Sequence, residues 1–297
     1  MTRQLVIAGI GEVLWDVYPD AARFGGAPAN FACHTAALGA DAWMVSAVGV
    51  DDLGARAVET LDRARVHCNS VARDPHHATG EVTVTLDSAG QASYRFADDT
   101  AWDHIVWTPA LEQLAQRCDA VCFGTLAQRY PASRATIQRF VSATPTRAMR
   151  MFDVNLRQQF YDAQVIKASL EIASAVKLND EELPIVAQLC AIDGSSQRQM
   201  LRTLMEHYEL RLAALTCGGK GALLMAGDEE SVCAAVPAKV VDTVGAGDAF
   251  TASIVPDFLA GLPLAAINRR ANAVASYVCS QPGAVMTLPE YLVTCTD

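Results

Sequence analysis

The amino-acid sequence predicts an α/β protein: a doubly wound, mostly parallel sheet flanked by helices, with a small β-sheet beside it. Short apolar runs recur along the 297 residues, and each is continuous and rich in Val, Ala and Leu, as expected for strands buried on both faces. Segments with helical spacing lie between these runs, and such an order predicts a parallel sheet. One segment instead alternates apolar and polar residues, which indicates a separate hairpin.

The elements of the main sheet follow this order along the chain. Strands are predicted at 5–10, 43–48, 120–123, 149–154, 176–178 and 212–216. Helices are predicted at 29–38, 53–65, 133–142, 197–208 and 265–279. Near the end, 221–225 and 231–236 are expected as short strands on either side of a turn at 226–230.

The alternating segment covers residues 81–96 and is predicted to be a hairpin with its turn at 87–90. Its apolar side chains fall on one face: Val82, Val84 and Leu86 in the first arm, and Ala92, Tyr94 and Phe96 in the second. A lone hairpin is marginally stable, so it needs a further strand or a partner surface. Residues 13–17, with Arg23 and Phe24 nearby, are expected to supply that strand.

Composition limits the classes of function. Hydrophobic residues make up 51% of the chain, enough for a large core, and the net charge of −10 argues against nucleic acid or an anionic membrane as a partner. No apolar run approaches the ~20 residues of a membrane span, and the first residues resemble a buried strand rather than a signal peptide. Nine cysteines without metal-binding spacing favour free thiols and a cytoplasmic location. His76 and His77 lie in a polar stretch and are expected to be solvated.

The most informative motif is the run from Asp242 to Asp248, Asp-Thr-Val-Gly-Ala-Gly-Asp. It follows Val240 and Val241, which have strand character, and precedes a helix expected over 249–260. Small residues at such a junction let backbone N–H groups converge on an anion, aided by the positive helix end. A carboxylate beside that anion is placed to take a proton from an attacking hydroxyl. The motif therefore predicts phosphoryl transfer to an alcohol.

Two other nucleotide motifs are excluded by spacing. The run 218–221, Gly-Gly-Lys-Gly, lacks the spacing and the hydroxyl of a P-loop. A dinucleotide fingerprint needs a third glycine where this chain has Leu14 or Phe250. The alternative for 242–248 is an ordinary glycine-rich helix start, but the flanking Asp242 and Asp248 favour a site.

Two signatures in the same order resemble those of the ribokinase-like (PfkB) sugar kinases. One is the run 25–32, Gly-Gly-Ala-Pro-Ala-Asn-Phe-Ala, followed by Gly39 and Gly49, and the other is 242–248. Segments 11–16, 152–157 and 177–182 are similar to bacterial fructokinases in particular. The resemblance departs at Ala252, where glycine is usual, and at Pro256, which is expected to kink or end the following helix.

The resemblance implies roles for the residues around both signatures. Asp248 would be the general base, and the amides of Gly245, Ala246 and Gly247 would form the anion hole. The implied sugar contacts are Asp16, Gly25, Gly26, Asn30, Phe96 and Arg157. The alternatives are a solvated strand-end charge for Asp16, a helix cap for Asn30, and a surface ion pair for Arg157 and, equally, for Arg129.

The resemblance also implies a nucleotide site. Asn179 and Glu182 would organise Mg²⁺ through water, although acids at a helix start are sensible by themselves. The implied nucleotide contacts are Thr216, Gly218, Lys220, Gly221 and Asn272; the alternatives are a plain Gly-Gly turn with a solvated lysine and, for Asn272, an exposed helix residue. Carbonyl groups near Asp242, Val244 and Gly283 would hold a K⁺ ion.

These implications give a specific expectation. The chain is expected to phosphorylate D-fructose to fructose 6-phosphate with ATP and Mg²⁺, as a monomer or homodimer. The core would comprise residues 1–10, 26–77 and 103–297, and a small β lid over the sugar would comprise 11–25 and 78–102. The alternatives are a kinase for another sugar, a sugar acid or a nucleoside, a non-catalytic sugar or nucleotide sensor, and a dinucleotide oxidoreductase.

Overall fold

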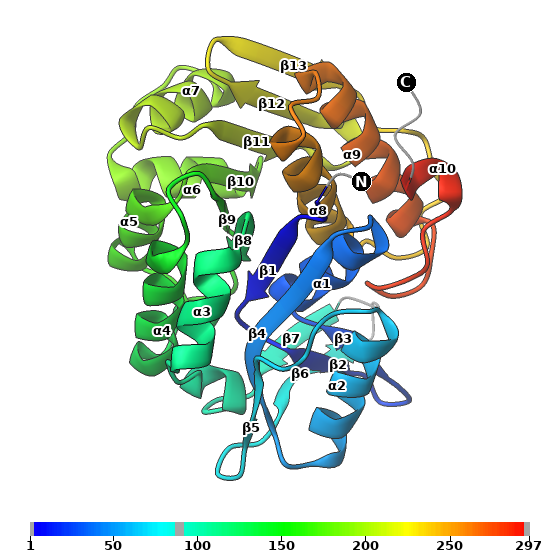
Figure 1. Ribbon diagram of the computed structural model, residues 1–297. Helices are drawn as coiled ribbons and strands as arrows, with labels where there is room; N and C mark the ends of the chain where they lie inside the picture. Colours follow the sequence, from blue (N-terminus) through cyan, green and yellow to red (C-terminus); the bar gives the residue numbers. More distant parts are fainter. Residues whose placement is uncertain (1–2, 87–91, 294–297) are drawn as a thin grey trace.

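The computed structural model describes residues 3–86 and 92–293, and the turn expected at 87–90 lies outside this part of the chain. Within the described residues, the main sheet has nine strands in the order β13-β12-β11-β10-β9-β8-β1-β4-β5 (Figure 1). Their bounds are β1 Val6–Ile10, β4 Asp41–Gly49, β5 Val71–Asp74, β8 Ala120–Phe123, β9 Met149–Asp153, β10 Ala175–Asn179, β11 Leu212–Thr216, β12 Ala222–Ala226 and β13 Glu229–Cys233.

The direction of the strands places the site. Strands β5, β4, β1, β8, β9, β10 and β11 are parallel, and β12 and β13 complete one edge as an antiparallel pair. From β1 the chain first builds towards β4 and β5, and later returns to add β8 to β11 on the other side. Crossover helices therefore leave a crevice at the carboxyl ends of β1 and β8, where ligands of doubly wound sheets bind.

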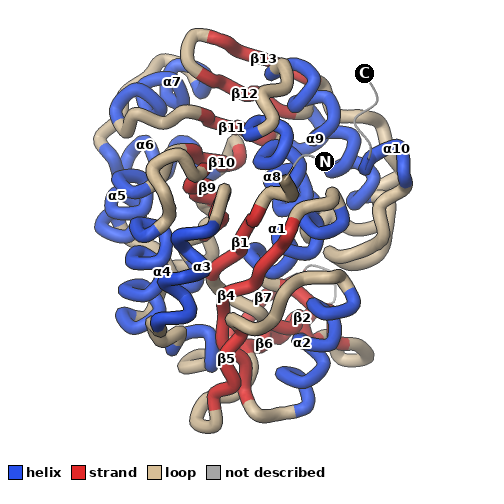
Figure 2. The backbone as a smooth tube through the Cα atoms, viewed as in Figure 1, coloured by secondary structure: helices blue, strands red, loops and turns tan. Residues whose placement is uncertain are grey.

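Helices cover both faces of this sheet (Figure 2). One face packs against α3 Pro109–Arg117, α4 Pro131–Ala143, α5 Ala163–Ile172, α6 Glu182–Cys190 and α7 Gln197–His207. The other packs against α1 Ala27–Ala37, α8 Ala246–Leu259 and α9 Leu264–Cys279, with α2 Asp52–Arg63 beside α1. Strand β1 shows why the strands are apolar on both faces. Its Ile10 packs in the core on the side of α3 to α7, and its Ile7 packs in the core on the side of α1, α8 and α9.

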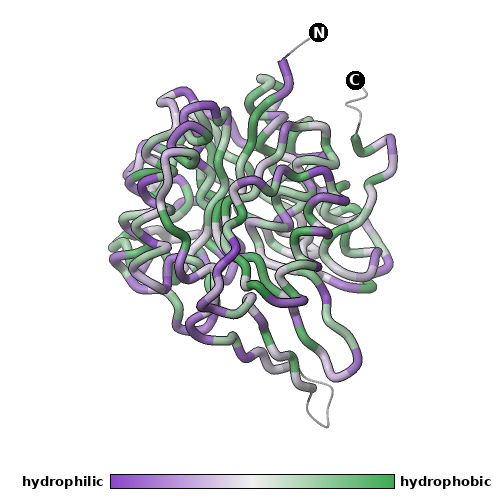
Figure 3. The backbone as a smooth tube through the Cα atoms, turned by 60° about the horizontal axis from the view of Figure 1, so that its bottom comes forward, coloured by the Kyte–Doolittle hydropathy of each residue, from purple (hydrophilic) through white to green (hydrophobic). Residues whose placement is uncertain are grey.

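A second sheet of four described strands, in the order β3-β2-β6-β7, lies at one end of the molecule. Its strands are β2 Leu14–Val17, β3 Ala22–Gly25, β6 Gly80–Leu86 and β7 Ala92–Phe96. The expected hairpin is therefore confirmed, with Val82 opposite Phe96, and β2 pairs with β6 in parallel as the third strand. Figure 3 brings this end of the molecule forward and shows hydrophilic segments mostly at the periphery.

Strands 120–123 and 212–216 are confirmed to the residue, and most other strands of the main sheet shift by one or two positions. The short elements η1 Ala101–His104, η2 Leu126–Gln128, η3 Gly218–Lys220 and α10 Glu290–Val293 complete the chain. Among the described residues no helix is long and apolar enough to cross a bilayer. The eight described cysteines are free thiols, as expected, and Cys295 lies outside the described residues.

Three expectations about local structure are wrong. Val240 and Val241 are 63% and 57% exposed in a loop, because β-branched residues form a strand only where another strand pairs with them. The turn after β12 is shorter than 226–230, since Glu229 and Glu230 already pair with Ala226 and Met225. Helix α8 continues through Pro256 to Leu259, so of the kink or end expected there the end is wrong, and the packing of its flanks outweighs the cost of a missing hydrogen bond.

Candidate active site

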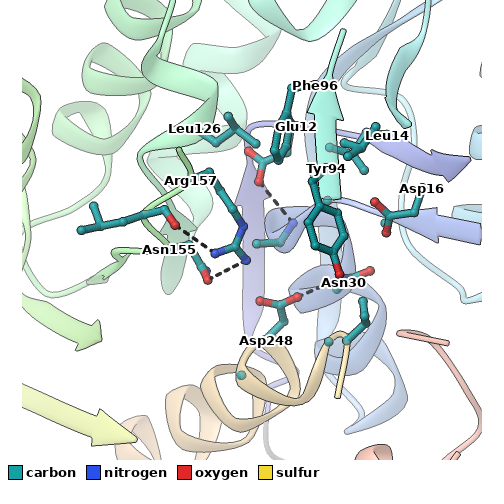
Figure 4. Close-up of a pocket in the computed structure, with 18 of the residues that line it drawn as sticks. Glu12, Leu14, Asp16, Asn30, Tyr94, Phe96, Leu126, Asn155, Arg157 and Asp248 are labelled. Atoms are coloured by element: carbon teal, nitrogen blue, oxygen red, sulfur yellow. Dashed lines mark hydrogen bonds between the residues drawn. The ribbon is translucent and has the colours of Figure 1, made fainter. Parts of the chain in front are cut away.

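A cavity of about 650 Å³ opens where the carboxyl ends of β1, β8 and β9 meet the small sheet and the N-termini of α1 and α8. In Figure 4, Asp248 from α8, Asn30 from α1, Asp16 from β2 and Arg157 from the loop after β9 surround one space. The cavity therefore brings together side chains that are separated by more than two hundred positions in the sequence.

Asp248 lies in the first turn of α8 and is only 8% exposed. Its Oδ2 accepts a hydrogen bond of 2.8 Å from Nδ2 of Asn30. Burial, followed by the charge of Asp153, raises the pKa of Asp248 to about 6, although Lys177 and Asn30 act in the opposite direction. The group is therefore an ionised base at neutral pH, and a stronger one than an exposed aspartate.

The N-terminus of α8 has no side-chain cap and lies at the cavity. Gly245 precedes the helix with φ of 79°, no side chain caps the helix, and a Cβ on Gly245 would approach Ala284 to 2.8 Å. Gly247 lines the cavity from the first turn, and Ala246 belongs to the same turn. Backbone N–H groups at such an uncapped end need an external acceptor, which a phosphoryl group provides.

A buried ion pair beside this turn was not identified from the sequence. Lys177 on β10 contacts Asp153 at the end of β9, with 3.0 Å between Nζ and Oδ1, and both side chains are almost fully buried. Burial disfavours the ammonium form, but Asp153, Glu182 and Asp248 outweigh it, so the pKa of Lys177 is raised. A Cβ on Gly247 would lie only 2.9 Å from Nζ, so glycine leaves room for this ammonium next to the helix end.

The signal for this pair was present but weak. A lysine and an aspartate each interrupt an apolar strand, at 177 and 153, and a charged residue in such a strand needs a partner. Only the parallel pairing of β9 and β10, with Lys177 opposite Asp153, identifies that partner.

All six expected sugar contacts, Asp16, Gly25, Gly26, Asn30, Phe96 and Arg157, line the cavity. Burial raises the pKa of Asp16 to about 6, with Arg157 lowering it, so Asp16 is not a freely solvated charge. Asn30 is not a helix cap, because α1 already begins at Ala27. Arg157 makes no ion pair within the described residues and contacts only Asn155 and the Leu156 carbonyl.

Glu12 and Tyr94 also line the cavity and were missed as site residues. Glu12 follows β1 and is 4% exposed; its Oε1 accepts from the Ala27 amide at 3.2 Å, and its Oε2 is buried without a partner. Burial raises the pKa of Glu12 to about 7. The position of an acid directly after a buried strand was the signal that could have identified it.

Arg129 does not belong to the cavity, and it is not a surface ion pair. Its guanidinium donates to both carboxylate oxygens of Asp103, at 2.7 and 2.6 Å, and both side chains are nearly inaccessible. It also donates to the Ala97 carbonyl and lies 4.2 Å from the centre of the Trp102 ring. Arg129 therefore fixes the segment after the hairpin to the main domain.

Asn179 and Glu182 form a reciprocal cap at the start of α6. Oδ1 of Asn179 accepts from the amides of Glu181 and Glu182, and Glu182 accepts from the Asn179 amide at 2.9 Å. The other oxygen of Glu182 accepts from the Leu156 amide. The structure thus gives both residues a role at the helix start, as the alternative to a metal site had it, and these oxygens, already bonded to backbone groups, fit a metal ion only through intervening water.

The remaining expected residues, those of the nucleotide site, do not line the cavity. Thr216 lies opposite Asn179 at the carboxyl edge, and Gly218, Lys220 and Gly221 form the turn that follows. Asn272 is 5% exposed and donates to Asn268, so the alternative of an exposed helix residue is wrong.

The residues expected near a monovalent cation do come together. Asp242 accepts from the amides of Val244 and Gly283, at 3.0 and 3.2 Å, and Val244 also lines the cavity. Arg23 of β3 forms an ion pair of 2.9 Å with Asp242 and so connects the small sheet to the loop before α8.

A buried base beside an open helix end, in a cavity closed by a small sheet, is typical of enzymes that transfer a phosphoryl group to a hydroxyl. Comparison with known proteins agrees: residues 21–290 match the family described as pfkB family carbohydrate kinase. The chain belongs to this family and is a carbohydrate kinase.

Individual relatives cover nearly the whole chain. The putative sugar kinase PH1459 of Pyrococcus horikoshii is 29% identical over 302 residues, 95% of this chain and 92% of that protein. Its crystal structure in complex with ATP has a TM-score of 0.79, at 27% identity, and covers 94% of each chain. The fructokinase of Klebsiella pneumoniae is 29% identical over 300 residues, 94% of this chain and 95% of its own. A fructokinase from Vibrio cholerae O395, in a form bound to fructose, ADP and calcium, shares the fold, with a TM-score of 0.79 at 22% identity and 96% coverage of each chain.

Proposed function

We propose that this kinase transfers the γ-phosphoryl group of ATP to a primary hydroxyl of a sugar, with D-fructose as the preferred acceptor. The observation that carries the proposal is the position of Asp248, a buried carboxylate at the uncapped N-terminus of α8 that faces the same cavity as Asp16, Asn30 and Arg157. The name fructokinase among relatives at 29% identity, and ATP in the structure of the archaeal relative, support the choice of substrates.

The reaction follows from the placement of these groups. The sugar hydroxyl gives its proton to Oδ of Asp248 as its oxygen forms a bond to the γ-phosphorus. The bond from that phosphorus to the bridging oxygen breaks, and ADP leaves with the electron pair. The amides of Gly245, Ala246 and Gly247 donate to the phosphoryl oxygens, where negative charge must be stabilised.

Lys177 adds a positive charge to this anion site. Its ammonium is buried, ionised, and adjacent to Gly247, while Asp153 holds it in place. A charge in so enclosed a position is weakly screened, so it acts on the anion site more strongly than a surface lysine would. We assign Lys177 a positioning and electrostatic role because it lies behind the glycine, not in the cavity lining.

The proposed nucleotide site extends along the same sheet edge. We place the nucleotide against Thr216, Gly218, Lys220 and Gly221, with Asn272 as a proposed neighbour of the adenine. Mg²⁺ would be held by phosphate oxygens and waters, with Asn179 and Glu182 outside those waters; the ion screens the phosphate charges. A K⁺ ion is proposed at the backbone around Asp242, Val244 and Gly283.

The small sheet is proposed to act as the lid over the sugar, comprising residues 11–25 and 78–102. Leu14, Val82, Tyr94 and Phe96 from this sheet line one side of the cavity, so its apolar face is turned towards the substrate. Exclusion of water there would suppress transfer to water instead of the sugar. The proposed unit of function is a monomer or a homodimer.

A panel of acceptors tests this proposal. In a coupled assay of ADP release, we expect D-fructose to give the highest kcat/KM among fructose, ribose, glucose, nucleosides and sugar acids. Arg157, which makes no ion pair within the described residues, is the specific observation that favours a sugar acid as the second candidate. If a sugar acid is preferred over fructose, the acceptor substrate is a sugar acid. If none of the tested acceptors is phosphorylated, the proposal is contradicted.

A further inference from the structure

A cluster of metal-ligating side chains lies away from the active-site cavity, where the chain enters and leaves the hairpin β6–β7. His77 precedes β6, whereas Asp99 and His104 follow β7. One ligand atom from each of the three residues lies within 4.8 Å of the other two. We propose that His77, Asp99 and His104 form a binding site for one divalent transition-metal ion, of which Zn²⁺ is the best fit.

The distances suit a small tetrahedral ion. Oδ1 of Asp99 lies 2.7 Å from Nε2 of His104 and 3.9 Å from Nε2 of His77. A tetrahedral zinc with bonds of roughly 2.0–2.1 Å separates its ligands by about 3.3 Å, which is midway between these two distances. Changes of about 0.6 Å in these two distances would match them to zinc, the third separation lies within 4.8 Å, and two nitrogens with one carboxylate oxygen are a ligand set that zinc accepts.

Asp74 orients His77 through hydrogen bonds. Its Oδ2 lies 2.8 Å from Nδ1 of His77, and its Oδ1 accepts from the amides of His76 and His77 at 2.8 and 3.2 Å. With the proton of His77 on Nδ1, facing Asp74, Nε2 is the nitrogen left to bind a metal ion, and it lies 3.9 Å from Oδ1 of Asp99.

The other two ligands are also held in place. The imidazoles of His77 and His104 stack with ring centres 3.7 Å apart, and Asp99 has a left-handed backbone with φ of 52°. The following turn is fixed by hydrogen bonds between Thr100 and Asp103 at 2.9 and 3.1 Å. The donors are therefore largely preorganised, while the 58% exposure of the Asp99 side chain leaves a side of the cluster open for access and a water ligand.

The position gives the site a consequence for the small sheet. Segments 74–77 and 99–104 are the two connections between the hairpin β6–β7 and the main domain. An ion bound to both would cross-link them, as a structural metal does, and stabilise the folded state in proportion to its occupancy. The metal site is independent of the proposed reaction, because none of its ligands lines the active-site cavity.

The test uses the untagged, full-length protein after removal of metals with a chelator. Titration with Zn²⁺ in a calorimeter should show one ion per chain with a dissociation constant of roughly 10 μM or below, and Zn²⁺ should raise the melting temperature. Co²⁺ should give the visible absorption of a tetrahedral centre. His104→Ala and Asp99→Asn should each weaken binding at least tenfold and abolish the increase in melting temperature.

His76→Ala is the matched control, because His76 is exposed, adjacent to His77, and outside the cluster. The fold of each variant is checked by circular dichroism and by its melting temperature without added transition metal. Asp99→Asn changes an exposed side chain by one atom, so it tests the site even if His104→Ala fails to fold. The proposal is overturned by the absence of saturable binding at one ion per chain, or by binding that both variants leave unchanged, which would point to the free cysteines.

Discussion

At the scale of single residues, the active site depends on charges that burial makes costly. Asp248, Asp153 and Lys177 lie within one buried group: the charge of Asp153 raises the pKa of Asp248, and both carboxylates raise the pKa of Lys177. A lone carboxylate in such surroundings would be protonated, but the ammonium of Lys177 and the amide of Asn30 keep Asp248 usable as a base near neutral pH. The same ammonium lies beside Gly247, at the proposed anion site.

Replacement of Asp248 tests its role as base. We expect Asp248→Asn to lower kcat roughly a hundred- to ten-thousand-fold, with fold and nucleotide binding retained. In the wild type, kcat/KM should decrease as the pH falls through about 6, because Asp248 of the free enzyme is then protonated. A coupled assay over a range of pH gives both quantities.

Asp228→Asn, in the exposed turn between β12 and β13, is the control and should behave as the wild type. A kcat of Asp248→Asn within threefold of the wild type, or a wild-type kcat/KM that is constant down to pH 5, would contradict the assignment.

At the scale of elements, the small sheet and the N-terminal segment of α8 are linked by the ion pair between Arg23 and Asp242. Arg23 belongs to β3, and Asp242 also orients the amides of Val244 and Gly283. The position of the proposed lid is therefore coupled to the loop that leads into the anion site. Since Arg23 is 47% exposed at its side chain, the pair is weak and sensitive to salt.

Loss of this pair should affect sugar binding more than chemistry. We expect Arg23→Ala to raise the KM for the sugar roughly two- to fivefold, with kcat changed by less than twofold, because exposed pairs contribute about 0.2–1 kcal/mol. The difference from wild type should become smaller in high salt. Arg63→Ala, which removes an exposed pair with Glu59 inside α2, serves as the control. An unchanged KM at low salt would show that the pair does not hold the lid.

At the scale of the whole molecule, folding gathers carboxylates around one cavity and removes them from water. Burial raises the pKa of Glu12 to about 7 and those of Asp16 and Asp248 to about 6. A carboxylate whose pKa is higher in the folded state makes the protein less stable as the pH rises from its unfolded pKa to its folded pKa. His34, whose pKa burial lowers to about 4, acts in the opposite direction, so only a comparison of variants isolates the carboxylates.

Glu12→Gln should therefore stabilise the fold at alkaline pH. Below about pH 4.5 both proteins carry a neutral side chain at this position, and the free energies of unfolding should differ little. Between pH 4.5 and 7 the free energy of unfolding of the variant should increase relative to that of the wild type. The difference should reach about 1–3 kcal/mol and stay constant at higher pH. Urea unfolding at pH 4.5, 6 and 8 measures this; a difference independent of pH would refute the assigned pKa shift.

The parallel sheet, the hairpin and the small-residue loop could all be predicted from the sequence, because each depends on local spacing. Residues 120–123 and 212–216 were assigned to the residue, since an apolar run buried on both faces has few alternatives. Val240 and Val241 show where this reasoning fails, because their strand propensity is satisfied only if another strand lies alongside. At Pro256 the same reasoning underestimates a helix: a proline opposes helical structure locally, but tertiary packing maintains α8 as far as Leu259.

By itself, the sequence determined which residues are candidates for catalysis and binding. They are an acid after a run of small residues, and amides and acids after buried strands. Only the tertiary structure decided which of them share a cavity and in which protonation state. It paired Arg129 with Asp103 in the interior, joined Asn30 to Asp248 by a hydrogen bond, and placed the ammonium of Lys177 beside Gly247. The physical reason is that burial and the proximity of other charges set the properties of a polar group, and both arise only when distant segments pack together.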